Sequence, residues 1–151
     1  MCARRFPRQV KRWLEVPNNI VQLLPFGHVI VVVDVKSSLY VLDIESGEQL
    51  LQLDSPALFD FSAITHPATY LNKVLLGSKQ GTMRLVNVKT GKLIHEFEKS
   101  FGSEIAVLEQ SPAIDVIAVG LKNGRILLHN IKYDETIQQY KQDGAVTSIS
   151  F

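Results

Sequence analysis

The chain has 151 residues, of which 46% are hydrophobic, and its formal net charge is +1. This is enough apolar material for a globular domain, and no run of about 18 apolar residues predicts a membrane-spanning helix. A single cysteine, Cys2, excludes a disulfide framework and a cysteine metal site, and it indicates an intracellular protein.

The positive charges are concentrated at the N-terminus. Residues 1–13 contain no acid and five basic side chains: Arg4, Arg5, Arg8, Lys11 and Arg12. Without these five, 11 basic residues stand against 15 acidic residues, so residues 14–151 carry a net charge of −4. The body therefore lacks the broad basic surface of a domain that binds RNA by itself. The cluster suits a nuclear or nucleolar address, a phosphate-contacting arm, the start of a transit peptide, or a plain solvated terminus.

From residue 20 onwards, short apolar stretches alternate with turn residues, which predicts β-strands. The first group has strands at 20–24, 29–35 and 49–53, with another strand after the turn at 36–38. The second group has strands at 58–64, 73–77 and 93–97, with another after the turn at 79–81. The third group has strands at 105–109, 116–120 and 136–140, with another after the turn at 122–124. The second strand of each group is almost continuously apolar, so we expect both of its faces to be buried.

These groups are copies of one another. GSKQGTMRLVNVKTGKLI at 77–94 aligns with GLKNGRILLHNIKYDETI at 120–137, and LYVLDIESGEQL at 39–50 is a third copy. A period of about 40 to 45 residues with several short strands is typical of β-propeller blades. We predict an all-β fold, an incomplete β-propeller of about three four-stranded antiparallel blades plus one strand of a fourth. The predicted divisions are a basic segment with room for an outer strand at 1–19, blades at 20–56, 57–101 and 102–143, and the first strand of a fourth blade at 144–151.

Glycines mark the turns of the repeat. Gly81 and Gly124 are expected to supply the positive φ of a tight hairpin, and Gly47 and Gly91 are expected in the turns before the fourth strands. The glycine-rich stretch around Gly81 is not a phosphate loop, because no lysine separates it from Thr82 and a strand follows.

Exposed loops are the expected contact points of such a fold. The candidate partner-contact residues lie in two of the hairpin turns: Lys79, Gln80, Lys122 and Asn123. A plain solvated turn is the simpler interpretation of all four.

The sequence contains no recognisable catalytic or metal-binding motif. The histidines are too widely spaced for a metal site: His28, His66, His95 and His129. Asp60 and Asp115 are expected in loops and not as general bases, and His129 is expected to pack at a blade surface. We therefore expect no enzyme and no cofactor.

The third strand and the turn after it have a familiar pattern. In TMRLVNVKTGKL at 82–93, Met83, Leu85 and Val88 stand at inward positions, and Val86-Asn87 stands where WD repeats have tryptophan and aspartate. The corresponding pairs are Leu42-Asp43 and His129-Asn130. The stretch resembles the WD-repeat (WD40) family, although no copy keeps the tryptophan or can build that family's full Trp/Ser/His/Asp hydrogen-bond network.

Longer segments narrow this resemblance. They are ITHPATYLNKVLLGSKQG at 64–81, SPAIDVIAVGLKNGRILLHNIKYDET at 111–136 and VTSISF at 146–151. They are similar to the WD-repeat subunit of the small-subunit processome that associates with U3 small nucleolar RNA, and blade geometry does not require ITHPATYLNK. The resemblance covers about residues 20–151.

This resemblance implies a non-catalytic scaffold for protein–protein assembly that acts in small-subunit rRNA processing and ribosome biogenesis in the nucleolus. The implied partners are other processome proteins, with RNA contacted indirectly and with no cofactor and no membrane. Two alternatives stay open: a protein that contacts nucleic acid through its basic N-terminal arm, and a general WD-repeat adaptor unrelated to ribosomes.

The number of blades is too small for a closed ring, which usually takes at least four. We therefore expect a fragment or truncated product of a longer protein, which needs further blades or a partner to close the propeller. Alone, the chain is expected to aggregate or to be stable only as an oligomer, because open blade faces and strand edges are exposed.

Overall fold

The computed structural model describes residues 14–54 and 59–151, whose strands form three four-stranded sheets. Blade 1 contains β1 (Ile20–Phe26), β2 (Val29–Asp34), β3 (Ser38–Asp43) and β4 (Gln49–Asp54). Blade 2 contains β5 (Phe61–Thr65), β6 (Lys73–Ser78), β7 (Met83–Asn87) and β8 (Leu93–Glu96). Blade 3 contains β9 (Ile105–Gln110), β10 (Val116–Leu121), β11 (Arg125–Asn130) and β12 (Glu135–Lys141). These bounds lie close to the predicted ones; residue 58, the predicted start of β5, lies outside the described residues.

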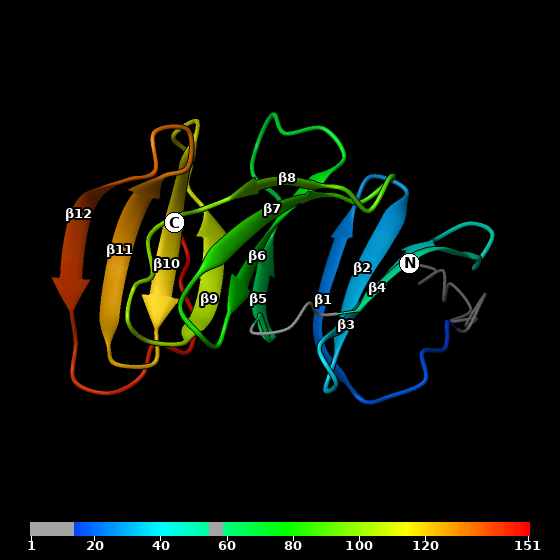
Figure 1. Cartoon of the computed structure of the whole chain (residues 1–151), viewed down its shortest axis with the longest axis horizontal. Helices are drawn as coiled ribbons and strands as arrows, with labels where there is room; N and C mark the ends of the chain where they lie inside the picture. The colour runs from blue at the N-terminus through cyan, green and yellow to red at the C-terminus, as the bar shows by residue number, and fades with distance from the viewer. Residues whose placement is uncertain (1–13, 55–58) are drawn as a thin grey trace, which may run out of the picture.

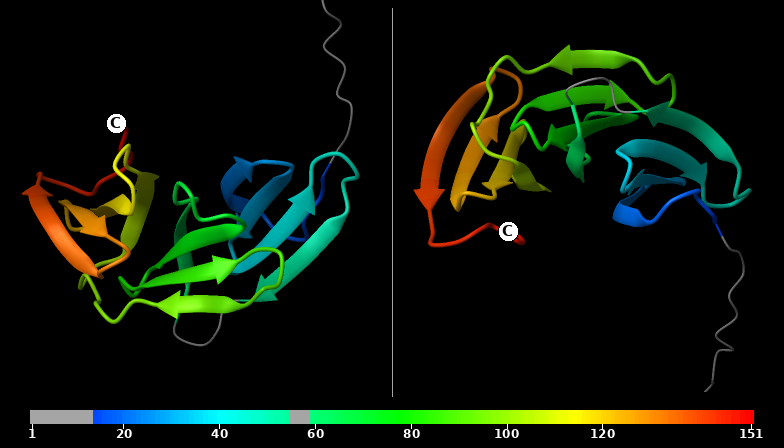
Figure 2. Two further views of the ribbon diagram at one scale, coloured as in Figure 1. Left: turned by 90° about the horizontal axis from the view of Figure 1, so that it is seen from above. Right: turned by 60° about the horizontal axis from the view of Figure 1, so that its bottom comes forward.

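The strands of each blade are antiparallel and lie in chain order, so each blade is a series of hairpins. The three blades stand side by side (Figure 1). Seen from the other directions, they follow an arc that does not close (Figure 2). The predicted all-β, incomplete propeller is confirmed.

The hairpin turns adopt the left-handed backbone that the glycines predicted. Gly81 has a φ of 81° and Gly124 a φ of 86°, and Ser37 takes the equivalent place in blade 1 with a φ of 61°. Gly47 and Gly91 also have positive φ, in the turns before β4 and β8. Glycine adopts this conformation without the steric penalty of a Cβ atom, which explains its recurrence at these positions.

Asparagine holds the turn before the fourth strand in blades 2 and 3. Asn87 Oδ1 accepts the backbone N–H groups of Lys89 at 2.9 Å and Thr90 at 3.2 Å. Asn130 Oδ1 accepts the N–H of Lys132 at 2.9 Å. These side chains stand where WD repeats have aspartate, and they replace a backbone acceptor in the turn.

Two hydrophobic cores lie between neighbouring blades. Val74 and Leu76 of β6 belong to the core between blades 1 and 2, whereas Leu75 belongs to the core between blades 2 and 3. Alternate side chains of one strand are thus buried on opposite faces, as predicted for the continuously apolar second strands. On the other face of blade 1, Leu14 and Val16 pack near Tyr40.

Glycine also lets the blades approach one another closely. A Cβ atom on Gly77 would lie 2.7 Å from Ile105 Cγ2, so β6 passes β9 only because this position lacks a side chain. A Cβ atom on Gly120 would lie 2.6 Å from Val146 Cγ1 and 3.1 Å from Ile149 Cδ1. Residues 146–149 therefore lie against blade 3 as β9 lies against blade 2.

The strand predicted at 144–151 does not form in the described chain, so this prediction was wrong. Val146 is buried and its N–H donates to Leu121 O at 3.2 Å, which fixes the start of the segment. A strand also needs a partner along its own edge, and no described residue supplies a second strand for this segment.

Candidate protein-interaction surface

The three blades present different connections at their two ends. The upper end in Figure 1 carries the loops from first to second and from third to fourth strands, and the lower end carries the second-to-third-strand turns. All four predicted contact residues lie in these lower turns and are exposed: Lys79, Gln80, Lys122 and Asn123.

Two of these turns are fastened to the linker before the first strand of the same blade. Gln80 Oε1 accepts the N–H of Asp60 at 3.0 Å, and Gln80 Nε2 donates to Asp60 Oδ2 at 3.2 Å. Lys122 Nζ forms an ion pair with Glu104 Oε2 at 2.9 Å. Both side chains thus have a role inside the fold. Asp60 lies in a loop, as predicted.

Asn123 and Lys79 differ in the contacts that they make with other described residues. Asn123 Oδ1 accepts the N–H of Arg125 at 3.2 Å, and Asn123 N donates to Ser103 Oγ at 3.2 Å. Lys79 is exposed and forms no ion pair with another described residue. A partner contact at any of these turns stays a prediction.

The predicted nucleic-acid or targeting cluster lies outside the described residues: Arg4, Arg5, Arg8, Lys11 and Arg12.

The outer boundary between blades 2 and 3, here called the 2–3 seam, is closed by His129, Phe97 and Phe101. His129 is fully buried, which corrects the predicted place at a blade surface. Its ring meets Phe101 edge-on, with centroids 5.3 Å apart, and Phe97 at 6.2 Å. The sequence did contain a signal for this burial, because His129 aligns with Val86, which faces a core from the same strand position.

Polar partners make the burial of His129 possible. Its Nε2 lies 3.1 Å from Asp134 Oδ1, and its Nδ1 lies 3.3 Å from Thr136 Oγ1. Since an ionised carboxylate only accepts, Nε2 carries the proton and Nδ1 accepts from the Thr136 hydroxyl. Burial lowers the pKa of His129, and the nearby Asp134 carboxylate opposes this only in part.

A polar contact joins blades 2 and 3 at the upper end. Tyr70 donates its hydroxyl to Asp115 Oδ1 at 2.8 Å. Burial, together with this carboxylate, raises the pKa of Tyr70 to about 12. Asp115 lies in a loop with a φ of 62°, as predicted, and it orients the neighbouring loop of blade 2.

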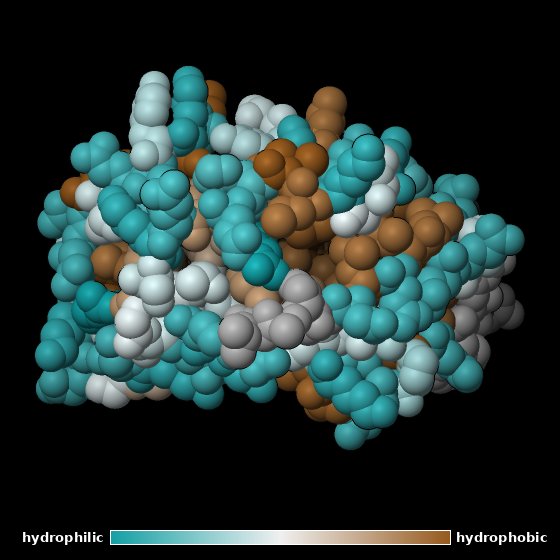
Figure 3. All heavy atoms as spheres, viewed as in Figure 1, coloured by the Kyte–Doolittle hydropathy of each residue, from teal (hydrophilic) through white to brown (hydrophobic). Residues whose placement is uncertain are grey.

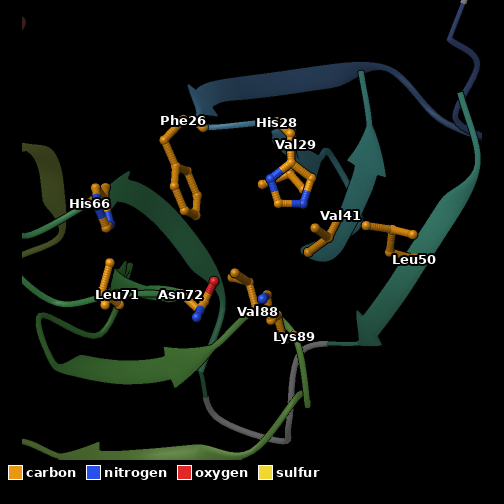
Figure 4. Close-up of a pocket in the computed structure, with 11 residues that line it drawn as sticks. Phe26, His28, Val29, Val41, Leu50, His66, Leu71, Asn72, Val88 and Lys89 are labelled. Atoms are coloured by element: carbon orange, nitrogen blue, oxygen red, sulfur yellow. The ribbon is translucent and has the colours of Figure 1, made fainter. Parts of the chain in front are cut away.

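The boundary between blades 1 and 2, the 1–2 seam, is hollowed at its upper end by a cleft of about 620 Å³, here called the upper cleft. Its apolar walls are Phe26, Val29, Val41, Leu50, Leu71 and Val88. The side chains surround an open space in Figure 4, and Figure 3 shows hydrophobic atoms gathered above this boundary. A second cleft, of about 380 Å³, opens between the same blades and is lined in part by Leu53 and Val86.

The upper cleft was not predicted from the sequence. Its lining comes from β1, β2, β3, β4 and two loops of blade 2, so no single stretch predicts it. One signal was present in the segment ITHPATYLNK, which blade geometry does not require and which contributes His66, Leu71 and Asn72 to the cleft.

No group of three His, Cys, Asp or Glu side chains within 14–54 and 59–151 is arranged to hold a metal ion. Over the same ranges, no helix has the length and apolar character needed to cross a membrane. What the geometry provides is a rigid set of blades with loops and an apolar cleft.

Comparison with known proteins adds the family. A family model described as WDR36/Utp21 first beta-propeller matches residues 2–151. WD repeat-containing protein 36 of Homo sapiens is 47% identical over 131 residues, which are 85% of this chain and 14% of that protein. The U3 small nucleolar RNA-associated protein 21 homolog of Schizosaccharomyces pombe is 45% identical over 92 residues, which are 61% of this chain and 10% of that protein. The chain thus spans a small part of the length of these curated relatives.

Solved structures share the fold at low sequence identity. The computationally designed Ika4 protein superposes with a TM-score of 0.75 and 22% identity, covering 92% of this chain and 84% of that one. The WD40 domain of Neurospora crassa Pan2 superposes with a TM-score of 0.68 and 16% identity, covering 83% and 37%. These likenesses show a WD40 propeller architecture, and the family model, which matches nearly every residue, shows that the chain belongs to the WDR36/Utp21 first β-propeller family.

Proposed function

We propose that this chain is a non-catalytic scaffold for protein–protein assembly in the small-subunit processome, where it supports small-subunit rRNA processing and ribosome biogenesis in the nucleolus. The family match over residues 2–151 carries this proposal, because the Schizosaccharomyces pombe relative is named as a U3 small nucleolar RNA-associated protein homolog. The partners are other processome proteins, and RNA is contacted through them.

The geometry supports a scaffold in two ways. The sheets hold their loops on a hydrogen-bonded frame, and such loops are the usual binding positions of a rigid fold. The upper cleft also leaves apolar side chains open to water, which is typical of protein contact sites.

Recovery of U3 RNA with the tagged chain tests the proposal. The chain is expressed in human or fission yeast cells and purified by its tag, and U3 RNA is quantified against an unrelated abundant RNA. The WD40 domain of Neurospora crassa Pan2 with the same tag is the control, since it shares the fold at 16% identity. We expect U3 RNA to be enriched with this chain and not with the control, and equal recovery would overturn the proposal.

Two further arms separate the alternatives. Deletion of residues 1–13 leaves U3 recovery unchanged if the blades make the contacts. If recovery is lost with the deletion and the purified chain binds RNA with a steep salt dependence, the basic arm is the functional element instead. Recovery of other assemblies without U3 RNA would indicate an adaptor unrelated to ribosomes.

A further inference from the structure

The upper cleft lies between blades 1 and 2, where loops of both blades meet at the upper end of the molecule (Figure 4). We propose that it is a docking site for an acidic protein segment that inserts a bulky apolar side chain. This inference rests on the proposed scaffold function and assigns it a place and a class of partner.

The first argument is the apolar surface of the cleft. Its volume of about 620 Å³ falls within the usual range of binding pockets, roughly 300–1,000 Å³. Leu71 is 79% exposed and Leu50 is 51% exposed, although both border the buried side chains Val29 and Val41. An inserted leucine or phenylalanine would remove this continuous apolar surface from water, which is the main source of stabilisation in such contacts.

The second argument is the charge of the lining. The polar residues of the cleft are His28, His66, Asn72 and Lys89, and no aspartate or glutamate of the described chain lines it. Lys89 provides a cation and Asn72 an amide donor for a carboxylate. Asp43 is outside the lining and is engaged in its own turn, where its Oδ1 accepts the N–H of Ser46 at 2.6 Å. The cleft is therefore complementary to an acidic segment.

The third argument is the rigidity of the walls. The rings of Phe26 and His66 stack across the two blades, 4.4 Å between centroids and 9° from parallel. His66 Nδ1 lies 2.8 Å from Lys73 O, and Val88 N donates to Asn72 O at 2.8 Å. Both loops of blade 2 are thereby fixed before a partner arrives, so little ordering cost opposes binding.

These features favour protein over RNA. Single-stranded RNA is usually bound by a basic groove with exposed aromatic faces on which bases stack. Among the described residues that line the cleft, Lys89 is the only lysine, and the ring of Phe26 is stacked on His66. The apolar walls match an apolar side chain better than a sugar–phosphate backbone.

Fluorescence anisotropy with defined peptides tests the site. The probe is a short synthetic peptide with leucine and phenylalanine at its centre and glutamates on both sides. One comparison peptide replaces the two apolar residues by serine, another replaces the glutamates by lysine, and a labelled oligouridine tests RNA. We expect the 151-residue chain to bind the first peptide at least about tenfold more tightly than either comparison peptide or the RNA, which corresponds to about 1.4 kcal/mol.

The repeat provides matched control variants. Leu71→Asp and Lys89→Glu change the cleft, whereas Ile114→Asp and Lys132→Glu make the same changes at similar loop positions of blade 3; Ile114 is 67% exposed. All four side chains are exposed, so the variants should keep the circular dichroism spectrum and melting temperature of the parent chain. Each cleft variant should weaken peptide binding about tenfold, and each control variant by less than about twofold.

Several outcomes would overturn the docking site: no binding of the acidic peptide by the folded chain, equal losses in the blade 3 controls, or preferential binding of oligouridine. The U3 recovery experiment distinguishes a failure of the docking-site proposal from a failure of the proposed scaffold function. If Leu71→Asp binds no peptide and still recovers U3 RNA at the parental level, the docking site is not needed for the scaffold function. If the parent chain recovers no U3 RNA and yet binds the peptide at the cleft, the scaffold proposal fails and the site stands.

Discussion

The two boundaries between blades join strands of the same order and differ in their side chains. In the 2–3 seam, Phe97 and His129 are almost completely buried and contact one another. The repeat places Leu53 and Val86 at the equivalent positions of the 1–2 seam, where both line the second cleft of about 380 Å³. Larger side chains thus accompany packed contacts at these two positions of the 2–3 seam, and smaller ones border a cleft at the same positions of the 1–2 seam. A separate hollow of about 380 Å³ lies at the upper end between blades 2 and 3, beside Tyr70, Asp115 and Lys132.

This difference shows how a repeat protein can specialise while keeping its strand order. All blades have the same order of strands, but the connections from the first to the second strand differ: residues 27–28 in blade 1, 66–72 in blade 2 and 111–115 in blade 3. At the two equivalent positions, side-chain volume sets the difference, because packed interiors leave few voids larger than a water molecule. At the upper cleft, the longer connection of blade 2 also contributes to the lining.

Truncation of the large aromatic side chain should have the largest effect. Phe97→Ala removes a side chain that is 2% exposed and should lower the free energy of unfolding by about 3–5 kcal/mol. Leu53→Ala changes the equivalent, half-buried position and should cost only about 1 kcal/mol. Urea denaturation followed by circular dichroism measures both. Equal losses would show that the two seams are packed equally well.

A methyl group at the close approaches between blades should have an intermediate effect. Gly77→Ala places a Cβ atom 2.7 Å from Ile105 inside the core between blades 2 and 3, which should cost about 1–3 kcal/mol. Gly120→Ala meets Val146 at a similar distance, in a segment that forms no strand, so this segment can shift and the cost should stay below about 1 kcal/mol. Thermal unfolding of both variants measures the difference. A larger loss for Gly120→Ala would mean that residues 146–149 are held as firmly as β9.

Acid should weaken the 2–3 seam through His129, with the smallest of the three effects. Burial lowers the pKa of His129 below its ordinary value of 6.5, so the unfolded chain binds the proton more readily than the folded chain. The stability that depends on the neutral ring is therefore present above pH 6.5 and is lost as the pH falls through the folded pKa. Melting temperatures between pH 7.5 and pH 5, values chosen about one unit or more on either side of 6.5, should show this loss.

Variants identify the group responsible for the acid effect. His129→Gln should have a flatter pH dependence than the parent chain, because the glutamine amide does not titrate. His95→Gln is the matched control, since His95 is exposed and lies against Phe97 of the same seam, and it should keep the parental profile. The same loss of stability in His129→Gln as in the parent would assign the acid sensitivity to another group.

Much of the fold could be predicted from local patterns. The buried second strands follow from their continuous apolar residues, and the turns at Gly81 and Gly124 follow from glycine at positions that need positive φ. The strand predicted at 144–151 did not form. Its apolar pattern favours a strand, but a strand also needs a neighbouring strand with which to form hydrogen bonds. His129 was predicted at a blade surface, whereas the structure buries it, and its half-buried polar partners Asp134 and Thr136 could not be foreseen.

The candidate contact residues and the upper cleft were much harder to predict from the sequence. Gln80 and Lys122 were correctly expected to be exposed, but their bonds to Asp60 and Glu104 depend on the path of the linkers between blades. The upper cleft depends on residues from two blades, and its volume is what remains after all of them are packed. Exposure can be estimated from one residue, whereas a cavity is a property of many side chains together.

The sequence by itself determined the blades, their hairpin turns and the family, because strand periodicity, turn residues and repeat spacing act over a few neighbouring positions. Only the tertiary structure decided how tightly the equivalent positions of the two boundaries are packed. The physical reason is that the packing of Phe97 against His129, and the gap beside Leu53 and Val86, arise between segments that are far apart in the chain.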